Sequence, residues 1–163
     1  YARRNGSRQP KTELIRPARQ AALRDLVAGA RQRPGLLTAP TTLAGVKQLI
    51  KALTAGDAVG LLPDQVPPSG QGVWAPFFGR DAYTMTLSAR LAQAGQTQVL
   101  VSWGERLSWG RGYRVHVRAF GPLDADPVQA AGQINRAMEA LVRECPAQYL
   151  WSYDRYKTPP PTR

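Results

Sequence analysis

The chain has 163 residues, of which 43% are hydrophobic and 20% are charged. These are values of a globular protein, and the length suits one domain with one core. No window holds the roughly 18 consecutive apolar residues of a transmembrane helix, and the start, YARRNGSRQP, lacks the apolar segment of a secretory signal. The composition therefore excludes a disordered chain and argues against a membrane span within these residues.

The charge is strongly positive, with 22 Lys and Arg against 11 Asp and Glu and a net charge of +11. Such an excess favours anionic partners such as nucleic acid, anionic lipid, phosphorylated sugars or an acidic carrier protein, although it can also serve solubility alone. A single cysteine, Cys145, excludes an internal disulfide and a Cys-based zinc site. A single histidine, His116, excludes a His-rich metal cluster, so we expect neither metal nor cofactor.

The N-terminal third predicts one short strand and two helices. Residues 12–15 form the strand, and a helix spans about 19–31, which places Arg31 and Arg33 at its end and in the following turn. A second helix covers residues 43–53, where apolar residues recur on one face. It is capped at its start by Thr41 or Thr42 and ended by Gly56.

Residues 56–85 are the centre of the prediction. A buried strand at 58–62 ends at Pro63 and is followed by Asp64 and Gln65. A loop rich in Pro and Gly then leads to aromatic residues and to a Gly-Arg-Asp turn, after which Thr84 caps a helix. A polar pair at the exit of a buried strand is typical of a ligand site in an α/β protein.

The rest of the chain predicts two strands and a helix. Residues 99–101 are continuously apolar, as in a strand covered on both faces, and 113–120 alternate as in a half-exposed strand. A helix starts at Pro127, and the tail, 158–163, is expected to be disordered. The alternation of helices and strands predicts an α/β fold: a mixed, mostly parallel sheet flanked by helices, in a single domain portion over 1–163.

The residues leave the chemistry of the loop open. The chain has no G-x-x-x-x-G-K-[ST], G-x-G-x-x-G or G-x-S-x-G motif, which disfavours common nucleotide and serine-hydrolase sites. Asp64 is either a ligand-binding acid or an ordinary turn residue. Arg31 and Arg33 either offset a helix dipole or clamp an anion.

Two further kinds of residue favour structural roles. Phe77 and Phe78 are more typical of a core than of a lipid site. His116 lies between Arg114 and Arg118 with no carboxylate at a spacing that would orient it. We therefore expect His116 to be a surface residue without a catalytic role.

Several blocks carry a family resemblance. The sequence contains LPDQVPPSGQGVWAPFFGRDAYTMTLSARLA, RPARQAALRDLVAGARQRPG, LAGVKQLIKAL and PAQYLWSYDRYKTPP. Together these resemble the lipid A biosynthesis acyltransferases, the late lauroyl and myristoyl transferases of the lysophospholipid acyltransferase superfamily. The PDQ block, the PFFG turn and the QYLW-x-Y-x-RYK ending are specific as a set, whereas each alone is weak.

The resemblance implies an O-acyltransferase reaction. In the family, the His of a His-x-x-x-x-Asp/Glu motif acts as general base on a sugar hydroxyl that attacks an acyl thioester. This chain lacks the motif, and the resemblance places it before Tyr1. We therefore expect a C-terminal fragment that lacks its catalytic base and its N-terminal membrane anchor and is inactive alone. His116 does not replace the missing base.

The resemblance also implies site residues. Asp64 matches the site aspartate on the substrate side of the pocket. Either Arg33 or Arg31 matches the site arginine; the spacing to Asp64 favours Arg33, and a small insertion leaves the choice open. Gln65 in the PDQ block is a further substrate-binding position. Three more match the loop after that block, where they would hold acyl chain or phosphate: Phe77, Phe78 and Arg80.

The implied partners are an acyl carrier protein as acyl donor, a phosphorylated glycolipid acceptor and an anionic membrane surface, at the cytoplasmic face of the bacterial inner membrane. The alternative is a non-catalytic module that binds anionic lipid or nucleic acid. Nucleic acid is disfavoured because the basic residues are spread along the chain and the aromatic residues form no stacking motif. Another acceptor, such as a lysophospholipid or an ornithine lipid, also remains open.

Overall fold

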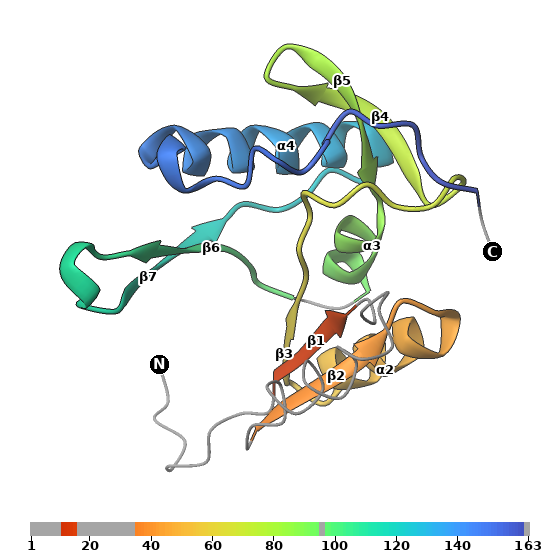
Figure 1. Cartoon of the computed structure of the whole chain (residues 1–163). Helices are drawn as coiled ribbons and strands as arrows, with labels where there is room; N and C mark the ends of the chain where they lie inside the picture. The colour runs from red at the N-terminus through yellow and green to blue at the C-terminus, as the bar shows by residue number, and fades with distance from the viewer. Residues whose placement is uncertain (1–10, 16–34, 95–96, 162–163) are drawn as a thin grey trace, which may run out of the picture. The chain divides into compact units, whose positions relative to one another are not determined.

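The computed structural model describes residues 11–15, 35–94 and 97–161 (Figure 1). The chain divides into two compact units, residues 1–62 and 63–163, and each is described by itself. Helices and strands occur together, which confirms the α/β class. The described strands form one three-stranded parallel sheet and two antiparallel hairpins.

The first unit is built on the parallel sheet. Strand β1 (Lys11–Ile15), which confirms the predicted strand, pairs in parallel with β2 (Leu36–Pro40) on one side and β3 (Ala58–Gly60) on the other. The sequence analysis did not predict β2, because its residues, LLTAP, are too few to show a period. The predicted helix at 19–31, with Arg31 and Arg33, lies outside the described residues.

Helix α2 (Leu43–Thr54) packs on this sheet and confirms the second predicted helix. The Thr42 hydroxyl accepts a hydrogen bond from the Gly45 N–H at 3.3 Å, as expected of an N-cap. After the helix, Gly56 has a φ of +83°, the left-handed conformation in which glycine ends helices. Leu49 is fully buried on the inner face of the helix.

The strand predicted at 58–62 is shorter and less buried than expected. It ends at Gly60, Ala58 is exposed, and Leu62 retains 63% of its accessible surface. Asp64 therefore lies in a turn four residues after the strand and not at its exit. A short apolar run does not show how many of its faces are covered, which is why the sequence overstated the burial.

The core of the second unit is a hairpin packed against a long helix (Figure 1). Strands β4 (Gly72–Phe77) and β5 (Arg80–Met85) pair antiparallel, and helix α4 (Pro127–Glu144) packs on β4. Pro127 is the first residue of α4, as predicted, and the Asp126 carboxylate caps the helix.

The hairpin corrects the predicted path of the chain after the loop. Phe78 and Gly79 form its two-residue turn, both with positive φ (48° and 76°), as tight hairpin turns require. Arg80 therefore begins a strand and does not lead into a helix. Thr84, predicted as a helix cap, is a fully buried residue of β5. Helix α3 (Leu87–Gln93) begins three residues later.

A second hairpin joins β6 (Val99–Arg106) to β7 (Tyr113–Phe120) through the short 3-10 helix η1 (Ser108–Gly110). Residues of β6 alternate between half-buried and exposed, so the prediction that 99–101 is covered on both faces is wrong. The predicted strand at 113–120 is confirmed. Among the described helices of either unit, none combines the length and the apolar character needed to cross a membrane.

Candidate functional site

The loop that carries Asp64 and Gln65 is held from the far end of the second unit. The Val66 N–H donates to the Tyr153 hydroxyl at 2.8 Å, and the Ser69 N–H donates to the Pro160 carbonyl at 2.8 Å. Val66 itself is 1% exposed. The C-terminal segment, residues 149–161, therefore holds the loop in place through hydrogen bonds at Val66 and Ser69.

The loop is also fixed from the hairpin. The buried Tyr83 hydroxyl accepts hydrogen bonds from the Gly70 N–H at 2.9 Å and from the Gly72 N–H at 3.1 Å. Gly72 lies so close to the hairpin that an added Cβ would be 2.6 Å from the Thr84 carbonyl oxygen. The loop rich in Pro and Gly is therefore tightly packed where it enters β4.

Asp64 is half-buried, and its charge acts on two neighbouring residues. Burial raises the pKa of the Tyr149 phenol, and the negative charge of Asp64 raises that pKa further. Burial lowers the pKa of the Arg155 guanidinium, while Tyr149 and Asp64 oppose this shift. Among the described residues the Asp64 carboxylate makes no hydrogen bond or ion pair.

Arg155 is the most deeply buried charge among the described residues, at 3% exposure. Its Nη1 donates to the Tyr83 carbonyl at 2.8 Å, and its Nη2 donates to Thr84 Oγ1 at 2.8 Å and to Asn135 Oδ1 at 3.3 Å. The Asn135 amide in turn donates to the Pro76 carbonyl at 3.0 Å. Arg155 thus joins the C-terminal segment, both strands of the hairpin and α4.

One donor of Arg155 is left over. Its Nε is buried without a hydrogen-bond partner among the described residues. Buried polar groups without partners are rare and costly, and they often mark sites that bind or react. The negative charge of Asp64 also acts on this guanidinium, which makes Arg155 a further candidate for the site.

The aromatic residues after the loop divide between core and surface. Phe77 is 2% exposed, and its ring lies 5.4 Å from the Arg155 guanidinium carbon. Phe78 is half-buried, packs edge-on against Phe77 with ring centroids 4.8 Å apart, and has the Arg143 guanidinium 5.0 Å from its ring centroid. Arg80 is exposed and stacks over the Tyr156 ring at 4.4 Å.

The structure therefore joins most of the predicted site residues through the C-terminal segment. The Arg155 guanidinium lies against the Phe77 ring, and the negative charge of Asp64 raises the pKa of Arg155. The Tyr156 hydroxyl donates a hydrogen bond to the Phe77 carbonyl at 2.6 Å. Gln65 is half-buried beside Asp64. The predicted arginines, Arg31 and Arg33, lie outside the described residues, so the structure does not choose between them.

Sequence reasoning assigned no role to Tyr149, Arg155 and Tyr156, which the structure makes further candidates because they contact or lie near predicted site residues. All three lie in the block QYLWSYDRYK, which contributed to the family resemblance without any role being assigned to its members. A charged residue surrounded by four aromatic residues in one short stretch was the available signal. The hydrogen-bond partners in the hairpin lie 71 to 79 positions away, which no local pattern can show.

The interpretation of His116 needs a correction. Its Nε2 lies 2.9 Å from a carboxylate oxygen of Glu105, and its ring stacks on Trp103 with centroids 4.6 Å apart. The prediction that no carboxylate orients His116 is therefore wrong. His116 pairs with Trp103 across the hairpin, which makes Glu105, two residues further on, its diagonal neighbour on the same face.

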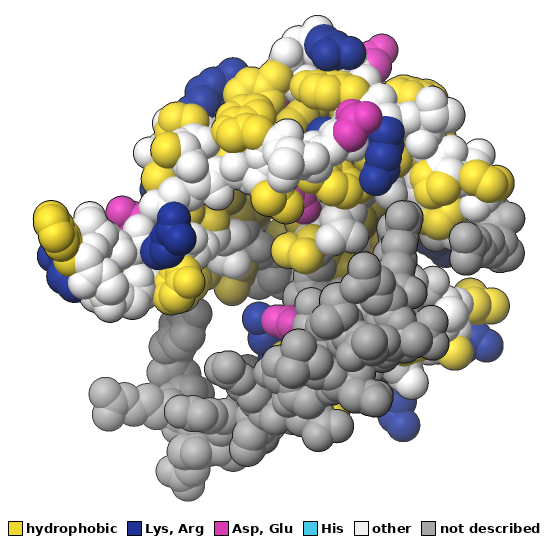
Figure 2. Space-filling model, in the orientation of Figure 1, with side chains coloured by type: hydrophobic (Ala, Val, Ile, Leu, Met, Phe, Trp, Pro, Cys, Tyr) yellow, Lys and Arg dark blue, Asp and Glu magenta, His cyan; other side chains and the backbone are white. Residues whose placement is uncertain are grey.

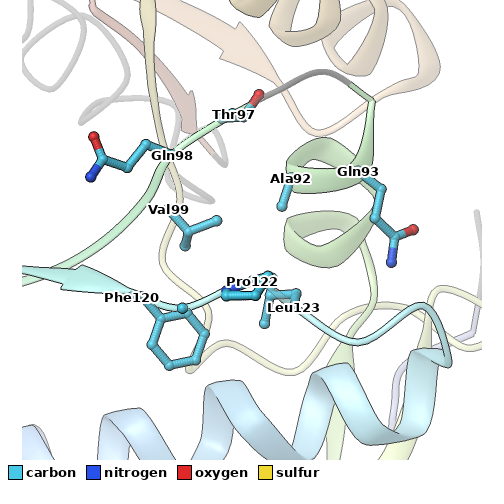
Figure 3. A pocket seen from close by; sticks show the side chains of 9 residues that line it. Ala92, Gln93, Thr97, Gln98, Val99, Phe120, Pro122 and Leu123 are labelled. Atoms are coloured by element: carbon cyan, nitrogen blue, oxygen red, sulfur yellow. The ribbon is translucent and has the colours of Figure 1, made fainter.

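A cavity of about 290 Å³ opens between α3 and the start of the second hairpin (Figure 3). None of the predicted site residues lines it, and none of its lining residues is charged. Its lining is Ala92, Gln93, Thr97, Gln98, Val99, Phe120, Gly121, Pro122 and Leu123. Among the described residues there is also no group of three or more His, Cys, Asp or Glu that could hold a metal ion.

Comparison with known proteins places this arrangement in a family. The model of the bacterial lipid A biosynthesis acyltransferases matches residues 5–158. The lipid A biosynthesis lauroyltransferase of Escherichia coli K12 is 30% identical over 119 residues, which are 71% of this chain and 39% of that protein. The palmitoleoyltransferase of the same strain is 28% identical over 118 residues, 71% of this chain and 38% of that protein.

A relative from Haemophilus influenzae, a lipid A biosynthesis acyltransferase, is 25% identical over 150 residues, which are 91% of this chain and 46% of that protein. The chain thus spans less than half the length of these curated relatives. The family match includes the loop with Asp64, the first hairpin of the second unit and the block around Arg155. The chain belongs to the bacterial lipid A biosynthesis acyltransferase family.

Proposed function

We propose that this chain is part of an enzyme that transfers a fatty acyl group from acyl carrier protein to a hydroxyl of a lipid A precursor. The observation that carries the proposal is the family match over residues 5–158, which contains the Asp64 loop, the first hairpin of the second unit and the block around Arg155. Relatives at 25–30% identity that are named lipid A acyltransferases support the same reaction.

The chemistry is an acyl transfer. The acceptor oxygen attacks the thioester carbonyl, a C–O bond forms, the C–S bond breaks, and the thiol leaves with a proton while a general base takes the hydroxyl proton. We propose that a His-x-x-x-x-Asp/Glu motif supplies this base. No such motif occurs in the 163 residues, so we propose that they do not catalyse transfer alone.

The residues of the second unit suit the substrate side of this reaction. An unpaired carboxylate at Asp64 is suited to accept a hydrogen bond from an acceptor hydroxyl and so orient it. The exposed Arg80 is suited to contact a phosphate of the acceptor, because guanidinium binds phosphate bidentately. Arg33 or Arg31 would complete the site. We propose the cytoplasmic face of the inner membrane as its place of action.

The test uses the longer protein that contains this chain, with acyl carrier protein loaded with a fatty acid and a lipid A precursor. We expect Asp64→Asn to lower kcat at least tenfold, with an unchanged melting temperature. Asp81→Asn, an exposed acid on β5, is the matched control and should keep the wild-type rate.

Two results would overturn the proposal. One is the absence of transfer by the wild-type protein to any lipid hydroxyl. The other is a wild-type rate in Asp64→Asn, which would remove Asp64 from the site. Comparing Arg31→Ala with Arg33→Ala in the same assay identifies the site arginine. If transfer is absent but the protein binds DNA with a steep salt dependence, the alternative of a non-catalytic binding module takes its place.

A further inference from the structure

The β6–β7 hairpin, residues 99–120, has one face that the rest of the second unit leaves uncovered. Residues that pair across the two strands share a face, and Leu100, Val115, Val117 and Tyr113 all lie on the same one. All four are exposed; Tyr113 keeps 72% of its accessible surface and Val115 keeps 69%. We call this the apolar face of the hairpin.

The opposite face is the one turned toward helix α4 and the C-terminal segment. Arg118 lies on it and forms a two-point ion pair with Glu144 at the end of α4, with Nη2 2.9 Å from Oε2. The backbone of Arg106, at the end of β6, exchanges two hydrogen bonds with the Gln148 side chain, at 2.8 and 3.0 Å. These contacts hold the hairpin in place and direct its apolar face away from the second unit's core.

The end of the hairpin presents a tryptophan. Trp109 is 95% exposed and has a φ of +60°, a left-handed conformation that bulky residues rarely adopt. Tyr113 follows closely, and Figure 2 shows hydrophobic and Lys or Arg side chains together at the free end of the hairpin. Trp and Tyr are the residues enriched where a lipid bilayer meets water.

The charges of the hairpin fit an anionic partner. It carries four arginines and one glutamate, Glu105, which is already engaged by Arg114 at 3.4 Å and by His116 at 2.9 Å. Arg106 and Arg111 therefore remain without a carboxylate among the described residues. Both flank the turn that carries Trp109, and an arginine can extend its charged group toward lipid phosphates while its stem stays on apolar surface.

We propose that the β6–β7 hairpin is a membrane-docking element that lies flat in the headgroup region of an anionic bilayer. The apolar face and Trp109 enter the boundary between headgroups and acyl chains, and Arg106 and Arg111 bind lipid phosphates. A protein partner would need only the apolar face of the hairpin to bind. The combination with an exposed tryptophan and with two arginines that have no carboxylate partner among the described residues favours lipid. The inference concerns docking and not acyl transfer, so it is tested without measuring the reaction.

The experiment measures binding of the chain to vesicles of 70% phosphatidylethanolamine and 30% phosphatidylglycerol by co-sedimentation, with pure phosphatidylcholine vesicles for comparison. We expect at least tenfold tighter binding to the anionic vesicles. The variant W109S/V115S/V117S should lose binding to them at least tenfold. The control variant L43S/L62S removes exposed leucines elsewhere and should bind as the wild type does.

A second variant separates the charges from the apolar face. R106Q/R111Q should weaken binding to anionic vesicles and reduce its salt dependence, while binding to phosphatidylcholine stays unchanged. Far-UV circular dichroism checks that each variant is folded. Vesicle binding that is unchanged in W109S/V115S/V117S overturns the proposal. If that variant instead turns a wild-type dimer into a monomer and keeps its vesicle binding, the face joins two copies of the chain.

Discussion

The guanidinium of Arg155 donates to the hydroxyl of Thr84 at 2.8 Å, across 71 positions of sequence. Thr84 is fully buried in β5, and its hydroxyl also accepts a hydrogen bond from the Asn135 amide at 3.0 Å. One residue of the C-terminal segment thus completes the hydrogen bonds between the hairpin and α4. The block around Arg155 has a structural role beside any role in the site.

Replacing Arg155 should destabilise the second unit. In Arg155→Met the Tyr83 carbonyl loses its bond from Arg155 and the Thr84 hydroxyl keeps only the bond from Asn135, and a buried polar group left without a partner costs about 1–3 kcal/mol. We expect Arg155→Met to lower the free energy of unfolding by at least about 2 kcal/mol, measured by urea denaturation. Arg90→Met, at an exposed helix position, should change it by less than about 0.5 kcal/mol. Equal stability of the two variants would contradict the network.

The Tyr83 hydroxyl should control the order of the site loop. Tyr83→Phe removes the acceptor of the Gly70 and Gly72 amides while it keeps the ring in place. We expect a loss of about 1–3 kcal/mol in unfolding free energy and faster hydrogen exchange at these two amides. Tyr113→Phe, which removes an exposed hydroxyl, is the control and should change neither measurement. Unchanged exchange in Tyr83→Phe would show that the loop does not depend on this contact.

Local patterns predicted α2 and α4 and missed the connections between elements. Helix α4 has a proline start, a capping aspartate and a clear period, so its first residue was predicted correctly. The turn at Phe78 and Gly79 was missed because the hairpin requires a phenylalanine at positive φ, which no propensity favours. Thr84 was taken for a cap because threonine is common at caps, whereas burial beside Arg155 determines its role.

In the candidate site, too, local sequence indicated some residues, and contacts between distant parts of the chain determined others. Asp64 was proposed from its position after a strand and a proline and from the family resemblance, although the strand ends earlier than predicted. Its neighbours Tyr149 and Arg155 come from the other end of the chain. His116 and Glu105 are diagonal neighbours across a hairpin, and their register was not fixed by the sequence. Contacts that depend on tertiary packing could therefore not be predicted from the sequence.

Two glycines in helices should respond oppositely to the same substitution. A Cβ on Gly45 in α2 would overlap the Pro40 carbonyl oxygen, a backbone atom that cannot easily move. In the middle of α4, a Cβ on Gly132 would meet only the end of the Arg136 side chain, at 3.3 Å. Helix propensity alone predicts that both Gly→Ala changes stabilise the protein by up to about 1 kcal/mol.

We expect Gly132→Ala to follow propensity and Gly45→Ala to reverse it, with a loss of about 1–3 kcal/mol from overpacking. Thermal and urea denaturation of both variants measure the difference. A melting temperature of Gly45→Ala at or above the wild-type value would show that α2 does not approach Pro40 as closely as described.

The pKa of Tyr149 tests the geometry of the site itself. Burial and then the negative charge of Asp64 raise this pKa above its usual value near 10. The pKa of Tyr149 is higher in the folded state than in the unfolded state. The neutral phenol therefore makes its full contribution to the free energy of unfolding when the pH is below the pKa of the unfolded state. This contribution is lost as the pH rises through the pKa that Tyr149 has in the folded state.

In Asp64→Asn the negative charge is gone, so the pKa of Tyr149 should fall toward its usual value while the contribution of burial remains. NMR of tyrosine labelled with carbon-13 at Cζ, titrated from pH 8 to 12, measures the shift directly. Asp81→Asn serves as control and should leave Tyr149 unchanged, because Asp81 does not contribute to its pKa. A Tyr149 titration that is identical in the wild type and in Asp64→Asn would show that the two residues do not interact and would remove Tyr149 from the candidate site.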